Sequence, residues 1–274
     1  MQSLIVTITI GLYEARHSIR NRVVFFATVL MTILSMAIGY LGTSKNGVFA
    51  LAGFDQIIIS LVSLSLYIIP LIALALGYDA IIGEKEDKTL DLILTLPVSR
   101  LQLFVGKFLG FGVVLAFSIF LGFMITGMII GATVGFEQFN HYLLFITNTI
   151  LLGLSFLAIS MLISAFAKSR PLAIGASIVI WFFFVFIYDM VLIGALLASD
   201  GMISPQLFSV SLFFNPADVN RILTLTHLDS AKIAYGLITL TEEENLSQIS
   251  IYIASLVWII APTSLGALIF KKDI

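Results

Sequence analysis

The residues of this chain that could do chemistry are few and lie far apart in the sequence. The three histidines are His17, His141 and His227, and there is no cysteine, so neither a thiolate metal site nor a cysteine nucleophile is available. No zinc-protease pair and no serine-hydrolase turn occurs. The pair Gly106-Lys107 lacks both the leading glycine and the following hydroxyl residue of a phosphate-binding loop. We therefore expect no ATPase site, no catalytic residue and no metal or cofactor bound by this chain.

Asp189 stands out because it lies inside an otherwise uncharged apolar stretch. Eighteen residues of helix, about 27 Å, separate it from Pro171. Ionisable groups at membrane depth are rare and usually functional. Asp189 could face a transport path, lie at the seam of a dimer, or contact a neighbouring helix, and the sequence leaves these roles open. Met124 and Met128, one turn apart, could meet copper, but methionines more often fill gaps in a core.

The elements that must position these residues follow from composition. Of 274 residues, 59% are apolar and 11% are charged, against about 45–50% and about 25% in a soluble domain. The net charge of −2 supplies no basic field for nucleic acid. Six stretches approach or exceed the roughly 20 apolar residues that a spanning helix needs. They are residues 23–43, 56–78, 108–136, 142–167, 171–197 and 246–270. We predict an all-α membrane protein with one transmembrane domain of six helices in the lipid bilayer.

The positive charges predict the orientation of these spans. Eleven of the 14 Lys and Arg residues fall on one side of the membrane. They are Arg16, Arg20, Arg22, Lys85, Lys88, Arg100, Lys107, Lys168, Arg170, Lys271 and Lys272, whereas Lys45, Arg221 and Lys232 fall on the other side. Because cytoplasmic loops carry the excess of Lys and Arg, we predict that both termini are cytoplasmic.

Residues 1–22 are predicted to form an amphipathic helix that lies on the cytoplasmic membrane surface. Apolar residues recur at helical spacing from Leu4 to Ile19, with Glu14 and Arg16 on other faces. The apolar part precedes the positive charges, which is the wrong order for a signal peptide.

The longest cytoplasmic segment contains a predicted short helix, residues 84–96. It begins with the acids Glu84, Glu86 and Asp87 and continues, after Thr89, with an apolar stripe of Leu90, Ile93 and Leu94. Pro97 ends the helix, and Ser99 with Gln102 fits a capping box that opens the next one. Such a helix could dock in a groove of a partner protein, or it could be a solvated connection, and the pattern favours neither.

A second long segment, residues 199–248, is predicted to form an external ledge of short helices. Ser204-Pro205 and Asn215-Pro216 each look like an N-cap followed by proline at the first helical position. The second helix would place its apolar residues on one face and Asp218 and Arg221 on the other, and an acidic run at 242–244 leads back to the last span. The ledge could seat a partner domain or simply cap the bundle.

Together these features resemble the permeases of type-2 ABC exporters over the whole chain. The most specific part is the cytoplasmic stretch Gly83-Glu84-Lys85-Glu86-x-x-Thr89-Leu90-x-x-Ile93-Leu94-x-x-Pro97-x-x-Arg100, which ends at Gly106-Lys107. Within the family, residues 70–84 and the stretch Asn215-Pro216-Ala217-Asp218-Val219-x-Arg221-Ile222-Leu223 look most like the subgroup that serves the copper maturation of nitrous oxide reductase.

The resemblance implies partners and roles that the residues alone do not. It implies a homodimer in the bacterial inner membrane, two cytoplasmic ATPases that hold ATP and Mg, and a periplasmic copper-handling protein of β-helical turns. Residues 84–96 would be the coupling helix that enters the ATPase. The ledge, with Asn215, Pro216, Asp218, Arg221 and Ile222, would seat the external partner. The transporter would move a sulfur species or do work on that partner; an exporter of lipid, polysaccharide or drug, and an ion-coupled secondary transporter, remain as alternatives.

Overall fold

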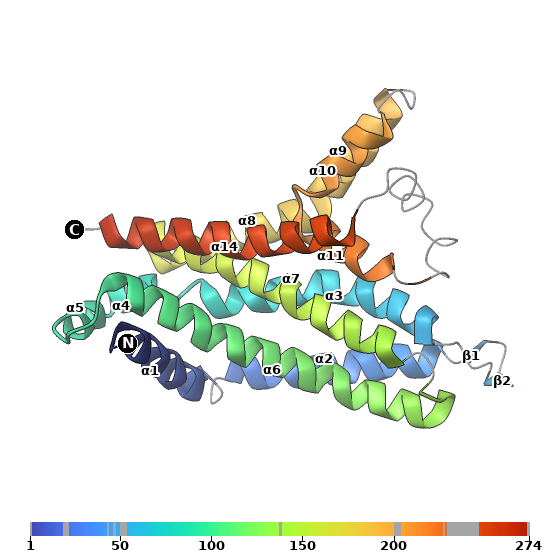
Figure 1. Cartoon of the computed structure of the whole chain (residues 1–274), viewed down its shortest axis with the longest axis horizontal. Helices are drawn as coiled ribbons and strands as arrows, with labels where there is room; N and C mark the ends of the chain where they lie inside the picture. The colour runs from blue at the N-terminus through green and yellow to red at the C-terminus, as the bar shows by residue number, and fades with distance from the viewer. Residues whose placement is uncertain are drawn as a thin grey trace.

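A computed structural model of the chain gives a bundle of long helices and one small antiparallel ribbon (Figure 1). It describes residues 2–18, 22–42, 44–45, 48–49, 54–136, 139–199, 204–226, 228 and 247–272. The predicted acidic run at 242–244, much of the end of the predicted ledge, and His227 lie outside the described residues.

The helices follow the predicted apolar stretches with shifted ends. They are α1 (Gln2–Ser18), α2 (Arg22–Gly42), α3 (Phe54–Gly77), α4 (Ile82–Glu86), α5 (Thr89–Leu94), α6 (Arg100–Val134), α7 (Phe139–Phe166), α8 (Arg170–Phe182), the π-helix η1 (Phe183–Ile187), α9 (Tyr188–Ala198), α10 (Pro205–Leu212), α11 (Pro216–Leu225) and α14 (Gln248–Lys272). Strands β1 (Ser44–Lys45) and β2 (Val48–Phe49) form the ribbon. Among the described residues, five helices are long and apolar enough to cross a membrane, and α2 is a shorter apolar helix. The predicted all-α membrane fold is confirmed.

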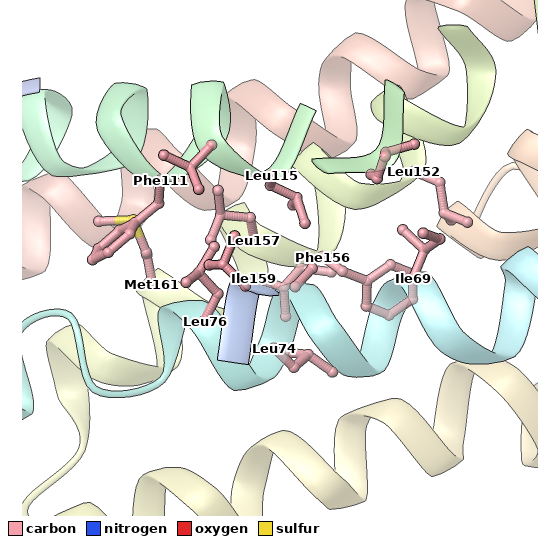
Figure 2. Close-up of a cluster of buried hydrophobic side chains, with 14 of the residues drawn as sticks. Ile69, Leu74, Leu76, Phe111, Leu115, Leu152, Phe156, Leu157, Ile159 and Met161 are labelled. Carbon is pink, nitrogen blue, oxygen red and sulfur yellow. The ribbon is translucent and has the colours of Figure 1, made fainter. Parts of the chain in front are cut away.

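The core lies where α7 is enclosed by α3, α6 and α14. Helix α7 is apolar on every side and buries residues on every side. Figure 2 shows its side chains Phe156 and Leu157 between Ile69 of α3 and Leu115 of α6. Helix α7 is therefore the central helix of the bundle, and it contacts elements at both ends of the bundle.

Helix α1 packs along the first turns of α6 through glycines. A Cβ atom added at Gly110 would lie 2.6 Å from the carbonyl oxygen of Gly11, and one at Gly106 would lie 2.8 Å from the side chain of Ile10. Only glycine permits this approach of two helix backbones. The apolar residues Leu4 and Leu12 point away from α6 and are each 67% exposed. The amphipathic helix is therefore present, and its position on the membrane surface stays a prediction.

The predicted fifth span is one continuous helix, Arg170–Ala198, made of α8, the π-helix η1 and α9. Helix α8 runs with the bundle, and after η1 the helix α9 leaves that direction and projects outward beside α10 (Figure 1). A π-helical turn is a common cause of a kink. Because this region buries few side chains within the chain, its direction must be set by contacts at its base.

The functional residues gather at two opposite ends of the bundle (Figure 1). We call the region of α4, α5, the first turns of α6 and α8, and the last turn of α14 the α4 end. We call the region of η1, α10 and α11 the α11 end. Helix α1 and the C-terminal turn of α14 lie toward the α4 end, so the structure is compatible with two termini on one side, whereas their cytoplasmic location stays a prediction.

Candidate functional site

At the α4 end, two serines of the core helix α7 form hydrogen bonds with the end of α3 and with the start of α4. The hydroxyl of Ser160 donates to the carbonyl of Leu74 at 2.8 Å. The hydroxyl oxygen of Ser164 accepts from the backbone N–H groups of Ile81 and Ile82 at 2.9 and 3.1 Å. These bonds satisfy donors at the start of α4 that no helical carbonyl reaches. Helix α4 therefore has a fixed position against α7.

Arg170, the first residue of α8, connects α8 to this turn. Its guanidinium lies 2.8 Å from Asp79 and 2.6 Å from Asp87, and its backbone N–H donates to Glu86 at 2.9 Å. Arginine can serve several acceptors at once because its donors are spread over a planar fork. Two of the acids predicted to contact an ATPase, Glu86 and Asp87, thus bind the protein's own arginine.

Lys107 makes a second connection, in which it is buried between two acids. Its ammonium lies 2.8 Å from Glu84 of α4 and 3.6 Å from Glu14 of α1, and only 5% of its side chain is exposed. A buried ammonium is costly unless it is paired, and here two carboxylates pair it. The third predicted contact acid, Glu84, therefore joins α4 to α1 and α6.

The predicted coupling helix, residues 84–96, is two short helices. Lys88 adopts a left-handed backbone, with φ of 57°, and separates α4 from α5. The side chain of Thr89 then donates to the carbonyl of Glu84 at 3.4 Å. A left-handed residue cannot continue an α-helix, which explains why the chain changes direction here.

The apolar stripe predicted to face a partner instead packs against the bundle. Leu90 is only 6% exposed, and Ile93 and Leu94 contact the main core. The residues that α5 and its C-terminal turn present outward are Leu92 and Leu96, which are 69% and 57% exposed. An apolar docking face on α5 would therefore consist of Leu92 and Leu96, because the tertiary contacts of α5 cover its other side.

At the α11 end, Asn215 connects the ledge to the π-helical turn in the fifth span. Its Oδ1 accepts from the backbone N–H of Ala217 at 3.0 Å, which confirms the predicted N-cap of α11. Its Nδ2 donates to the carbonyl of Phe184 in η1 at 2.9 Å and to Asp218 at 2.8 Å. One amide therefore caps α11 and supplies a donor to a carbonyl of the π-helical turn.

Arg221 completes this network by pairing with two acids. Its guanidinium lies 2.7 Å from Asp218 and 3.0 Å from Asp189 of α9. Burial raises the pKa of Asp218 to about 7, against the opposing attraction of Arg221. Of the roles left open for Asp189, contact with a neighbouring helix is observed, and a place in a transport path or dimer seam stays a prediction.

The residues predicted to form the contact face of the ledge are mostly buried. Asn215 and Asp218 are 0% and 1% exposed, and Pro216 and Ile222 are buried as well, because α11 packs between α7 and α14. They hold the ledge in place and do not form its outer surface. The outward apolar residues belong to α10 and the turn after it, where Leu207, Val210 and Phe214 are 67%, 53% and 65% exposed.

Metal ligands do not gather within the part of the chain that the structure describes. No group of three His, Asp or Glu side chains there could hold an ion. Met124 packs against the core, whereas Met128 is 50% exposed, so the two methionines have different surroundings.

Sequence reasoning missed the basic partners of both networks at the α4 end. The sequence pattern assigns Lys107 and Arg170 no acidic partner, because those partners are distant in sequence. One sequence feature could have identified Lys107: it lies two turns into a predominantly apolar helix, where an ammonium needs a partner.

Comparison with known proteins finds similarity to transporter permeases over nearly the whole length of this chain. Residues 8–273 match the family described as ABC-2 family transporter protein. The chain is similar to a probable ABC transporter permease protein NosY of Pseudomonas aeruginosa, with 34% identity over 268 residues, which cover 96% of this chain and 97% of that protein. A protein of the same description from Stutzerimonas stutzeri is 33% identical over 263 residues, or 94% and 95% of the two chains.

Proposed function

This chain belongs to the ABC-2 family of transporter permeases, and we propose that it is the membrane subunit of an ABC transporter that supports maturation of the copper-sulfur centre of nitrous oxide reductase. The transporter would contain two copies of the chain and two cytoplasmic ATPases, which bind ATP and Mg. The family assignment excludes the alternative function of an ion-coupled secondary transporter, which the sequence alone left open.

The observation that carries this proposal is the construction of the α4 end. An exposed apolar pair, Leu92 and Leu96, lies next to a helix that Glu84 and Arg170 tie to the bundle. An ATPase that binds this pair can move α4 and α5, and the ion pairs pass that movement to α1, α6 and α8. The permease supplies no chemistry of its own and works by changing shape.

The α11 end supports the second half of the proposal, which is a partner outside the membrane. Leu207, Val210 and Phe214 recur at intervals of three and four residues and form an outward apolar stripe. We assign this stripe to the periplasmic copper-handling protein of β-helical turns. Because the chain has no cysteine, it is a poor copper channel, and mechanical work on that partner explains the arrangement better than passage of copper. Movement of a sulfur species remains compatible with it.

A double variant, Leu92→Asp with Leu96→Asp, tests the ATPase contact. Coexpression with the ATPase and purification through a tag on this chain should recover at least about tenfold less ATPase, since each leucine loses apolar burial. Leu207→Asp is the matched control, because Leu207 is as exposed as Leu92 but lies at the other end. Equal recovery of the ATPase with both variants would refute the docking assignment.

A cellular experiment tests the biological role. Inactivation of the gene should leave nitrous oxide reductase present as polypeptide but deficient in its copper-sulfur centre, measured by copper content and visible absorption. A fully loaded reductase would contradict the proposal and favour a type-2 exporter of lipid, polysaccharide or drug.

A further inference from the structure

A pocket of about 690 Å³ lies at the α4 end, beside the Arg170 network, with which it shares Glu86. It is bordered by α4, by the end of α7 with the residues after it, and by the last turn of α14. Its size lies within the range of about 300–1,000 Å³ that is usual for ligand sites. Neither the sequence motifs nor the proposed docking surfaces account for it.

The charges that line this pocket are predominantly positive. It is lined by Lys85, Lys168 and Lys272 and by a single acid, Glu86. The carboxylate of Glu86 accepts from the backbone N–H of Arg170 and shares its guanidinium, at 3.8 Å, with Asp79 and Asp87. It offsets at most one of the three lysine charges of the lining. The pocket therefore keeps an excess of positive charge.

The three lysines differ in what they already contact. Lys85 donates to the carbonyl of Ala165 at 3.3 Å and lies over the ring of Phe270. Within the described residues, Lys168 and Lys272 form no ion pair, and both are exposed. Lys85 thus neutralises the negative C-terminal end of α7, and the other two lysines remain to attract an anion.

The pocket also has an apolar edge. Phe166 and Ile269, at the ends of two long apolar helices, are 54% and 38% exposed beside the lysines. Lysines directly after an apolar span mark the level where hydrocarbon meets the lipid headgroups. A ligand that fits both parts has an anionic head and a hydrocarbon tail.

We propose that this pocket binds an anionic phospholipid of the surrounding leaflet, with the phosphate between Lys168 and Lys272 and an acyl chain along Phe166 and Ile269. Basic pockets between membrane helices on the cytoplasmic side are suited to such headgroups. The bound lipid bridges α4, α7 and α14 and so stabilises the position of α4. This inference does not depend on the biological role proposed above.

The test compares the intact protein in nanodiscs of phosphatidylcholine alone with nanodiscs of phosphatidylcholine and phosphatidylglycerol at three to one. The thermal unfolding temperature of the wild type should rise with phosphatidylglycerol. In detergent, native mass spectrometry should show phosphatidylglycerol bound about 25-fold more weakly to Lys168→Gln/Lys272→Gln, or about fivefold for each lysine.

Lys271→Gln is the matched control, since Lys271 is an exposed neighbour that does not line the pocket. It should keep the wild-type response to lipid. A double variant that responds like the control would overturn the proposal.

Two further measurements separate other anions from lipid. If soluble glycerol phosphate stabilised the wild type as well as phosphatidylglycerol does, the site would be a phosphate site without lipid specificity, and the proposal would be wrong. If the double variant bound lipid normally but lost the ATPase on purification, the lysines would belong to a protein interface.

Discussion

Each end of the bundle contains an arginine that pairs with at least one acid of another element, but the two networks differ in their contact with water. At the α11 end, Arg221 binds Asp218, which is 1% exposed. At the α4 end, Arg170 binds Asp79 and Asp87, whose side chains are 43% and 55% exposed. Water screens an exposed ion pair and stabilises its separated charges, whereas a buried pair has no such substitute. Arg221 and Asp189 are themselves 30% and 29% exposed, so the buried member of the first network is Asp218. We therefore predict that the Arg221–Asp218 pair fixes a geometry and that the Arg170 pairs change partners at lower cost.

This difference matches what each end must do in a transporter. The α11 end joins a bent span to the ledge, and the two must move as one body if a movement of the span is to reach an external partner. In the proposed transporter the α4 end would meet a moving ATPase and would need contacts that can rearrange. Lys107 is the exception there, because only 5% of its side chain is exposed, which is close to the 1% of Asp218. We infer that Lys107 carries the rigid part of the coupling and Arg170 the adjustable part.

The largest effect is expected from Arg221→Ala, which removes the charge between Asp218 and Asp189. Above about pH 7, where Asp218 is ionised, a buried carboxylate would lose its cationic partner, and breaking such a pair typically costs about 3–5 kcal/mol. Thermal unfolding in detergent at a fixed scan rate should show the loss, and hydrogen exchange should increase first in α9 and α11. The double variant Asp218→Asn/Arg221→Met should lose less than Arg221→Ala alone. If it lost more, the burial of an unpaired charge would not be the cause.

The next prediction concerns pH and the same carboxyl group. The pKa of Asp218 is about 7 in the folded protein and 3.8 for an ordinary aspartate. Between these values the folded state keeps a proton that the unfolded state has lost, so stability from this group is full below about pH 4 and falls as the pH rises to 7. The unfolding temperature of the wild type should therefore fall relative to that of Asp218→Asn as the pH rises from 4 to 7. Below pH 4 the two unfolding temperatures should change with pH in the same way. Parallel curves would show that Asp218 does not titrate in this range.

Lys107→Met tests the buried ion pairs that Lys107 forms at the α4 end. It leaves Glu84 and Glu14 without their shared cation, at an expected cost of about 2–3 kcal/mol, which is less than for Arg221 because both acids are partly exposed. Adding Glu84→Gln should recover part of the lost stability. Lys271→Met, at an exposed position, is the control and should leave the unfolding temperature unchanged. A normal unfolding temperature for Lys107→Met would place Lys107 among the adjustable contacts.

The features that sequence predicts well in this protein are local. The capping box of Ser99 and Gln102, and the N-caps Ser204 and Asn215, are all present, because each depends only on residues within one turn of helix. The long apolar spans were found for a similar reason, since length and composition suffice. These features fix where helices start and which of them can cross a membrane.

The features that sequence misses depend on contacts between distant residues. The spacing of Leu90, Ile93 and Leu94 predicts a helix face, and the docking hypothesis directs it outward, whereas Leu90 is buried and Ile93 and Leu94 are partly buried against the core. The π-helix Phe183–Ile187 lies within an aromatic run, and no residue type there distinguishes it from an α-helix. Asn215, which donates to the carbonyl of Phe184 in this helix, lies 31 residues further along the chain. Periodicity identifies a helix face, and only the packed fold decides whether that face is inside.

The smallest effect is expected from Asp87→Ala, which removes one acid from the exposed cluster. Arg170 keeps Asp79, and its backbone N–H keeps Glu86, so no charge is left buried and alone. The unfolding temperature should change by no more than about 2 °C, and the difference should shrink further at high salt, because salt screens exposed pairs. Arg170→Ala is the informative comparison, since it removes the guanidinium from both Asp79 and Asp87, leaves Glu86 only the backbone N–H, and should separate α8 from α4 in hydrogen exchange. If Asp87→Ala destabilised the protein as much as Arg221→Ala does, the α4 cluster would be as rigid as the α11 network, and the two ends of the bundle would not differ in the way that their exposure to water implies.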